Sequence, residues 1–312
     1  MIILPTDKNL EKAVCILREG GLIGLPTETV YGLAADATQD SAIASIFEKK
    51  KRPIFNPLII HGPSSKAFKE HVLWNEKAET LAQAFWPGPL TLVLPRRSSS
   101  PLSLLASAGL DSLAIRVPNH PIALSLLRGF GKLLAAPSAN PSGKMSPTQA
   151  SHVEADFPSL FTFEGGDTSV GLESTIVDLT GSSPLLLRPG GIPQEEIESL
   201  IGSLGTAPEG PIKAPGMMKS HYAPTLPLRL NAQGPLEGEA YLAFGCTSYE
   251  GKHVLNLSQK KDLAEAAGNL FKMVRLLDRP EYQQIAVAPI PFTGLGVALN
   301  DRLQRAAAPR EL

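Results

Sequence analysis

Short hydroxyl, amide and cationic side chains gather in seven segments that are also rich in proline and glycine. In chain order these are PTETVYGL (26–33), KKKRPIFNPLIIH (49–61), WPGPLTLVL (86–94), LAIRVPNHP (113–121), APSANPSGKMSPT (136–148), GLESTIVDL (171–179) and LLRPGGI (186–192). Each contains or adjoins an apolar run that favours a strand. Such side chains bind anions by hydrogen bonds and charge. The pattern therefore predicts an anion-binding pocket lined by the loops at strand ends.

Two basic positions are the strongest candidates for holding an anion. Lys50 and Arg52 lie in a run of four cations, and Pro53 forces the chain out of helical structure there. A basic helix end, favoured by the helix dipole, would explain the run equally well. Arg116 lies in an apolar strand, where an unpaired charge is costly, so it needs an anionic partner. That partner is either a substrate or a structural carboxylate, for which Asp36 and Glu173 are the candidates.

Several other polar residues have an ordinary structural interpretation beside the functional one. Ser138 and Asn140 flank a strand end and could hydrogen-bond a phosphate, but their segment is also typical of a turn. His61, at the end of an apolar run, could be a ligand or a half-buried structural histidine. Thr27 and Ser174 offer hydroxyls that could equally cap a neighbouring helix or turn.

Well-known catalytic motifs are missing from the chain. The sequence has no GxxxxGK[ST], no HExxH and no GxSxG, and the stretch GLGVAL from Gly294 lacks the third glycine of a dinucleotide fingerprint. A Ser/His/Asp hydrolase built on Ser138 therefore has no nucleophile elbow to support it. The six histidines show no metal-ligand spacing.

Composition excludes further classes of protein. The 29 basic and 30 acidic residues give a net charge of -1, so there is no overall basic field for nucleic acid. Cys15 and Cys246 are the only cysteines, which excludes a disulfide framework and a zinc finger and favours a reducing compartment. No apolar run approaches the ~18 residues of a membrane span. We expect a soluble, cytoplasmic protein.

Alternating strand and helix patterns up to about residue 203 predict an α/β domain with a mixed sheet. Strands are expected at 22–25, 58–61, 90–94, 113–117, 133–135, 175–179 and 184–188, the last two joined as a hairpin. Helices are expected from about residue 10 to 18 and at 40–50, 76–85, 121–128 and 193–201, with another starting after residue 148.

A proline- and glycine-rich linker, residues 204–226, separates this domain from a smaller unit at 227–312. Strands at 240–244 and 285–288 and helices at 262–277 and 296–307 predict a small Rossmann-like α/β domain. Its short length predicts a small sheet.

The seven segments, in this order, resemble the threonylcarbamoyl-AMP synthase family, whose catalytic module is the YrdC-like domain. The resemblance continues through APGMMKSHYAP (214–224) and GLGVALNDRLQRA (294–306), which match the two-domain form of the family. It implies a twisted mixed sheet with helices, followed by a Rossmann-like domain. It also implies an enzyme that makes threonylcarbamoyl-adenylate and pyrophosphate from L-threonine, bicarbonate and ATP. The product supplies the modification of an adenosine beside the tRNA anticodon.

The resemblance also implies roles for individual residues. Lys50 and Arg52 correspond to the family's catalytic KxR pair. The implied ATP-binding residues are Lys50, Arg52, Asn56, Ser112, Ser138, Asn140, Ser146, Arg188 and Tyr222. The implied threonine-binding residues are Thr27, His61, Arg116, Ala136 and Ser174. Tyr222 would reach back from the linker, which would act as a lid. Mg²⁺ would be bound mainly through ATP, with no dedicated protein site, and the product would pass to the tRNA threonylcarbamoyl-transfer machinery.

Two alternatives share this kind of module. Maturation factors that form carbamoyl-adenylate are much longer and carry zinc-finger cysteines, which this chain lacks. An RNA-binding module would present a basic concave face. The first 200 residues hold 17 basic against 20 acidic side chains, so we expect no strong direct binding of nucleic acid.

Overall fold

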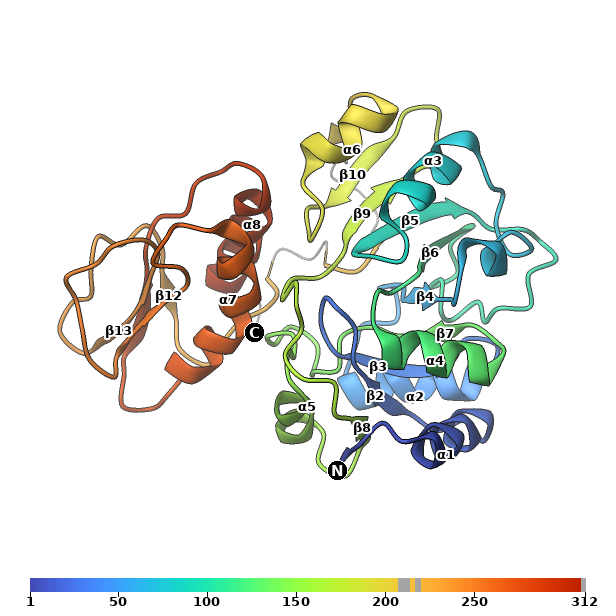
Figure 1. The fold of residues 1–312 in the computed structure, drawn as a ribbon, viewed down its shortest axis with the longest axis horizontal. Coiled ribbons are helices and arrows are strands. Elements are labelled where there is room, and N and C mark those ends of the chain that lie inside the picture. Colours follow the sequence, from blue (N-terminus) through green and yellow to red (C-terminus); the bar gives the residue numbers. More distant parts are fainter. Residues whose placement is uncertain (207–213, 217–219, 310–312) are drawn as a thin grey trace.

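The computed structural model describes residues 1–206, 214–216 and 220–309. Two sheets organise these residues, one of eleven strands and one of four. In Figure 1 the large sheet with its helices lies to the right and the small unit to the left. In the described part of the chain, no helix is both long enough and apolar enough to cross a membrane.

The large sheet is mixed, as the sequence predicts. Across the sheet its strands are β1 (Ile2–Ile3), β8 (Phe161–Phe163), β2 (Ile23–Leu25), β3 (Gly32–Asp36), β7 (Leu134–Ala135), β4 (Ile59–His61), β6 (Ser112–Arg116), β5 (Leu90–Pro95), β9 (Thr175–Asp178), β10 (Leu185–Arg188) and β11 (Gly205–Thr206). The pairs β4–β6 and β5–β9 are parallel, whereas β2–β3, β5–β6 and β9–β10 are antiparallel.

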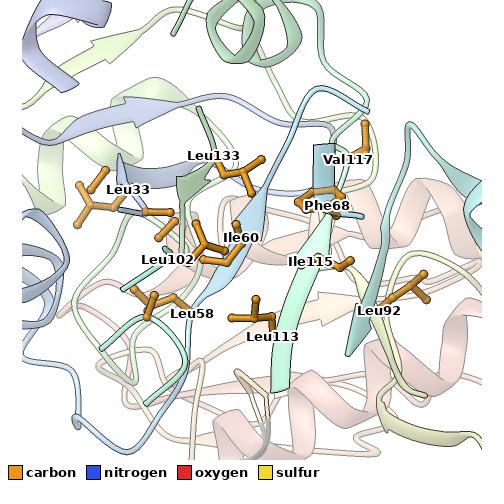
Figure 2. Close-up of a cluster of buried hydrophobic side chains, with 14 of the residues drawn as sticks. Leu33, Leu58, Ile60, Phe68, Leu92, Leu102, Leu113, Ile115, Val117 and Leu133 are labelled. Atoms are coloured by element: carbon orange, nitrogen blue, oxygen red, sulfur yellow. The ribbon is translucent and has the colours of Figure 1, made fainter. Parts of the chain in front are cut away.

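Helices cover both faces of this sheet. They are α1 (Asp7–Arg18), α2 (Asp40–Lys50), α3 (Glu76–Phe85), α4 (Pro121–Phe130), α5 (Ala150–Asp156) and α6 (Gln194–Ile201), with a 3₁₀ turn η1 at Ser65–Phe68. Alternation along β3 shows the two faces: Leu33 and Ala35 belong to the apolar cluster that includes side chains of α2, α3 and α6, whereas Ala34 belongs to the cluster that includes side chains of α1 and α4. The main core lies on the first face, and Figure 2 shows Ile60, Ile115 and Leu92 of three strands in it.

The structure confirms the predicted strands and helices of this part, with boundaries that differ by at most three residues. Our sequence interpretation missed β1, β3, β8 and β11. Strand β3 reads GLAAD, and its glycine and alanines carry no β-propensity. Its five residues are all buried, so tertiary packing decides its conformation.

The small sheet is parallel, with the order β12 (Leu228–Arg229), β15 (Gln284–Val287), β13 (Glu239–Ala243) and β14 (Val254–Asn256). Helices α7 (Leu263–Leu277) and α8 (Leu295–Ala307) pack on the face that presents Ala240, Leu242 and Val287. A small, Rossmann-like α/β unit was predicted, and a short parallel sheet covered by helices agrees with it.

Helices α7 and α8 lie between the small sheet and the large unit (Figure 1). Lys272 of α7 pairs with Asp167 at 2.6 Å, and Arg275 of the same helix pairs with Asp156 at 2.9 Å. Tyr222 of the linker and Leu172 of the large unit belong to the same apolar cluster as α7 and α8. The two units therefore share a packed interface.

The predicted division at 203 and 226 stays a prediction. Strand β11, Gly205–Thr206, pairs with β10 of the large sheet, which places it two residues past the expected domain end. Residues 207–213 and 217–219 of the predicted linker lie outside the described residues.

Candidate active site

A partly enclosed cavity lies where several loops follow or precede strands of the large sheet. Strands β4 and β6 are parallel and end at His61 and Arg116, which are partners in the register. Thr27 follows β2, Ala136 follows β7, and Ser174 precedes β9. Strand pairing thus brings residues from distant segments together: Arg116 lies beside His61, and Ala136 lies beside Ile59, two residues earlier in β4.

Nine of the fourteen residues predicted for the site line this cavity. They are Thr27, Arg52, His61, Arg116, Ala136, Ser138, Ser174, Arg188 and Tyr222. The other five are Lys50, Asn56, Ser112, Asn140 and Ser146, which are not among the lining residues. What each residue binds stays a prediction, and the geometry below describes how each is held.

Arg116 has a carboxylate partner that sequence reasoning did not identify. Its Nη2 lies 2.8 Å from Oε1 of Glu28, and both side chains are about 95% buried. The predicted partners, Asp36 and Glu173, were wrong: Asp36 pairs with Lys132 at 3.0 Å, and Glu173 pairs with Arg302 at 2.7 Å. The ion pair therefore joins the PTETVYGL segment, which follows β2, to the end of β6.

Glu28 and Thr27 belong to one compact loop. The hydroxyl of Thr27 donates to the carbonyl of Val30 at 2.6 Å and lies 2.8 Å from the hydroxyl of Thr29. The backbone nitrogens of Thr29 and Val30 donate to the same Thr27 oxygen. Local hydrogen bonds of the kind that threonine makes in turns therefore fix the loop beside Arg116.

Arg188 and Ser174 both line the cavity and are joined by hydrogen bonds. The guanidinium of Arg188 donates to the carbonyl of Ser174 at 2.9 Å and to its hydroxyl at 3.2 Å. The Ser174 hydroxyl also lies 2.7 Å from that of Thr91. Burial, above all, lowers the pKa of the Arg188 guanidinium. An anion in the cavity would offset that loss of hydration.

Arg52 reaches the cavity from the loop after α2. Its Nη2 donates to Oδ1 of Asn56 at 2.6 Å and to the carbonyl of Pro57 at 2.8 Å. Asn56, predicted to bind ATP, therefore holds Arg52 from behind. Burial and the nearby Arg188 lower the pKa of Arg52 to about 9. Two buried cations that line one cavity favour an anion beside them.

Lys50 lies behind the wall that carries Ser138. Its side chain is buried, and its Nζ donates to the carbonyls of Ser138, at 2.6 Å, and of Asn140. The amide nitrogen of Asn140 donates to the carbonyls of Pro141 and Lys144, both at 2.9 Å. The structure therefore joins the KxR and SxN segments through the Lys50 ammonium group.

Ser112 and Ser146 occupy different places. Ser112 begins β6, four residues before Arg116, and it does not line the cavity. Ser146 donates to Oε1 of Glu173 at 2.5 Å, and Glu173 itself lines the cavity. Ser146 thus contacts the site through a carboxylate.

The described part of the linker closes one side of the cavity. Pro215, Gly216, His221 and Tyr222 are lining residues. The carbonyl of Pro215 accepts a hydrogen bond from Arg188 at 3.2 Å. A Cβ at Gly216 would lie 2.8 Å from Cδ of Arg188 and 2.9 Å from the Tyr222 hydroxyl, so glycine permits this close approach. The described linker residues thus form part of the cavity lining, and a lid function of the linker stays a prediction.

Some site residues were missed by sequence reasoning. Glu28 lies in the PTETVYGL segment, His221 in APGMMKSHYAP and Arg302 in GLGVALNDRLQRA, but no functional role was predicted for them. All three have polar or charged side chains, and each residue is at most 7% exposed. No periodicity in the sequence predicts that burial, although a charged residue inside a glycine- and proline-rich segment hints at it.

Burial governs the histidines of the site. It lowers the pKa of His61 to about 3, with Arg116 adding to the effect, and it lowers the pKa of His221 to about 3. Both imidazoles are therefore neutral at neutral pH. In the unfolded chain they take up protons below a pKa of about 6.5.

We expect these two histidines to make the protein sensitive to acid. Because the unfolded state binds more protons than the folded state between pH 6.5 and 3, the free energy of unfolding falls as pH falls through that range. Each histidine contributes a slope of about 1.4 kcal/mol per pH unit. Urea unfolding of His61→Asn between pH 7 and 5 should show a slope shallower by about that amount. An unchanged slope would contradict the assignment of a neutral, buried imidazole.

Known proteins match this chain over both of its units. A family model described as telomere recombination matches residues 15–190, and one described as threonylcarbamoyl-AMP synthase, C-terminal domain, matches residues 192–308. A threonylcarbamoyl-AMP synthase of Pyrococcus abyssi is 42% identical, over 99% of this chain and 98% of its own. One of Bacillus subtilis is 39% identical, over 97% and 94%.

A solved structure shares the whole architecture. The crystal structure of Pyrococcus abyssi Sua5 complexed with L-threonine matches with a TM-score of 0.91 and 40% identity, covering 98% of this chain and 97% of that one. Fold and site therefore define a two-domain enzyme with a YrdC-like catalytic module. The chain belongs to the threonylcarbamoyl-AMP synthase family. It is an enzyme of the nucleotidyl-transfer type that forms threonylcarbamoyl-adenylate for tRNA threonylcarbamoyladenosine biosynthesis.

Proposed function

We propose that the cavity condenses L-threonine, bicarbonate and ATP. The threonine amine captures carbon dioxide, released as bicarbonate loses water, and gives a carbamate. A carbamate oxygen then attacks the α-phosphate of ATP, the bond between the α-phosphorus and the bridging oxygen breaks, and pyrophosphate leaves. The products are threonylcarbamoyl-adenylate, pyrophosphate and water. The mixed anhydride is labile, so the site has to exclude water.

Arg116 is the observation that carries the threonine half of this proposal. A buried arginine at a strand end, held from one side by Glu28, keeps further N–H groups for a carboxylate. Thr27, Ala136 and Ser174 line the same cavity. His61 is neutral there, because burial lowers its pKa, so it can exchange hydrogen bonds without adding charge. The Pyrococcus abyssi structure, crystallised with L-threonine, supports this half.

The ATP half rests on the cations of the other walls. Arg52 and Arg188 are both buried and both line the cavity. Charge developing on the leaving pyrophosphate would be stabilised by such fixed cations in a dry site. Lys50 positions the Ser138–Asn140 segment, and Asn56 positions Arg52. We propose that the hydroxyl of Tyr222 completes the nucleotide contacts from the linker.

We propose that Mg²⁺ enters with ATP. Magnesium at such sites is commonly held by substrate phosphates and one or two carboxylates, with waters completing its shell. The two carboxylates of the cavity region, Glu28 and Glu173, are already paired with Arg116 and Arg302. The phosphate oxygens are the donors that remain for the cation.

The product would be consumed by a separate tRNA-modifying activity. A mixed anhydride of this kind transfers its acyl group readily, and its adenylate is the leaving group. We propose that the chain works in the cytoplasm and hands the adenylate to the tRNA threonylcarbamoyl-transfer machinery. The net charge of -1 supports delivery of a small molecule rather than strong direct tRNA binding.

We expect pyrophosphate release to require all four components together: threonine, bicarbonate, ATP and Mg²⁺. The measurement is a coupled pyrophosphate assay with each component omitted in turn, and mass spectrometry identifies the adenylate. L-serine replaces threonine as the matched control, because it lacks one methyl group and retains the carboxylate. Pyrophosphate release that is indifferent to threonine would overturn the proposed reaction.

A further inference from the structure

Arg302 of α8 is a fully buried arginine of the small unit, and two of its three acceptors lie in the large unit. Its Nε donates to Oε2 of Glu173 at 2.7 Å, and its Nη2 donates to the carbonyl of Pro189 at 2.9 Å. Both acceptors belong to the large unit. The neighbouring Asp301 accepts from Nη1. A single guanidinium thus anchors α8 to the two segments that frame the start of β9 and the end of β10.

The same guanidinium lies over the ring of Tyr222. Its central carbon is 5.0 Å from the ring centroid, within the range of a cation–π contact. His221 and Phe271 contact the ring from other sides, with centroids at 4.1 Å and 5.6 Å. Tyr222 also adopts a φ of 64°, an unusual backbone conformation for a residue other than glycine. Such conformations persist only where the surroundings fix them.

The hydroxyl of Tyr222 is the functional end of this assembly. Tyr222 is 1% exposed and lines the cavity, and its buried hydroxyl has no hydrogen-bond partner among the described residues. A buried polar group without a partner is costly, so its natural partner is a bound ligand. Arg302 contacts the ring but not the ligand-facing hydroxyl. Its contribution would therefore be to orient that hydroxyl.

Arg302 also lowers the pKa of the Glu173 carboxyl. Burial alone would raise the pKa of its carboxyl, but the Arg302 and Arg188 cations lower that pKa to about 2. The charged carboxylate of Glu173 accepts a hydrogen bond from Ser146 at 2.5 Å. The next residue, Ser174, accepts a hydrogen bond from Arg188. Arg302 therefore stabilises the wall that carries Arg188 as well as the lid residue.

We propose that Arg302 is a positioning residue of the synthase site, through which the small domain aligns the Tyr222 hydroxyl with bound nucleotide. This inference rests on the proposed binding of ATP in the cavity. It gives the second domain a direct part in the reaction: α8 supplies the group that holds the lid residue in its ligand-facing orientation. A purely structural interdomain contact would not distinguish between tyrosine and phenylalanine at position 222.

A double-mutant cycle tests the proposal. Tyr222→Phe keeps the stacked ring and removes only the hydroxyl, so in the wild-type background we expect kcat/KM to fall about 10- to 100-fold, the range for a hydrogen bond to a charged group. In the Arg302→Met background the hydroxyl is no longer aligned, and the same change should cost less than about threefold. The dissociation constant of ATP with Mg²⁺, measured by calorimetry, should show the same pattern.

Two further variants keep the test decisive. Arg279→Met removes an exposed arginine of the small domain. In this background, Tyr222→Phe should change kcat/KM and the dissociation constant of ATP by the same factors as in the wild-type background. If Arg302→Met does not fold, Arg302→Lys replaces it, because lysine keeps a charge opposite Glu173 but lacks the planar guanidinium over the ring. Thermal unfolding checks each variant.

The outcomes separate the two proposals. Equal effects of Tyr222→Phe in both backgrounds would overturn the positioning role of Arg302, and so would a silent Tyr222→Phe in an active enzyme. A wild-type protein that binds ATP but makes no adenylate would contradict the proposed function. In that case the cycle measured on ATP binding would still decide the role of Arg302.

Discussion

Lys50→Met should lower the turnover of the enzyme by about two to four orders of magnitude. The buried ammonium donates to the carbonyls of Ser138 and Asn140, and hydrogen bonds from a charged donor contribute about 1.5–3 kcal/mol each. Losing both removes the link between the loop after α2 and the Ser138 wall, and it removes a cation near Arg52. Each 1.4 kcal/mol in the barrier corresponds to about a tenfold change in rate.

The adjacent lysines provide matched controls. Lys49 and Lys51 are exposed, and Lys49 lies 5.4 Å from the ring of Phe157, away from the Ser138 segment. Lys49→Met and Lys51→Met should therefore keep turnover within about threefold of wild type, because exposed charge contacts contribute little. Initial rates of pyrophosphate release, with ATP affinity and thermal unfolding, measure the three variants. A similar loss in all three would mean that the positive charge of the segment matters rather than the buried position of Lys50.

Helical register explains why this lysine differs from its neighbours, and that register is readable in the sequence. Ile43, Ile46, Phe47 and Lys50 recur at the spacing of one helix face, and all four are buried in α2. The apolar periodicity thus places Lys50 inward and Lys49 outward. The resemblance to the family motif predicts that Lys50 is the functional lysine of this run, and the buried face of α2 gives an independent physical reason for the same prediction.

Contacts between distant segments set the limit of sequence reasoning. The strand ends that carry His61, Arg116 and Arg188 follow from apolar runs, because a strand predicted from its pattern ends where polar residues begin. The Arg302–Glu173 contact joins residues 129 positions apart on different units. Burial of a charge depends on which surfaces meet, and no local pattern encodes that meeting. For the same reason the sequence favoured Asp36 and Glu173 as partners of Arg116, and Glu28 was not predicted.

Arg116→Met should weaken the use of threonine far more than the use of ATP. If two charge-assisted hydrogen bonds to the threonine carboxylate disappear, we expect KM for threonine to rise by about 100- to 1000-fold. The dissociation constant of ATP should change by less than about threefold, because we propose that Arg52 and Arg188, rather than Arg116, hold the nucleotide in this cavity. Arg116→Lys should fall between the two, since lysine keeps the charge without the bidentate geometry.

Arg116→Met should also lower the free energy of unfolding, so its effect on KM for threonine needs a control. Removing Arg116 leaves the Glu28 carboxylate buried without its cation, which costs about 3–5 kcal/mol. Lys132→Met removes the cation from another buried carboxylate, Asp36, at a site that does not line the cavity. It should lower the free energy of unfolding yet leave KM for threonine unchanged, so the two variants separate loss of stability from loss of substrate binding. A rise in KM for threonine in Lys132→Met as large as in Arg116→Met would show that Arg116 acts through the fold and not on the substrate.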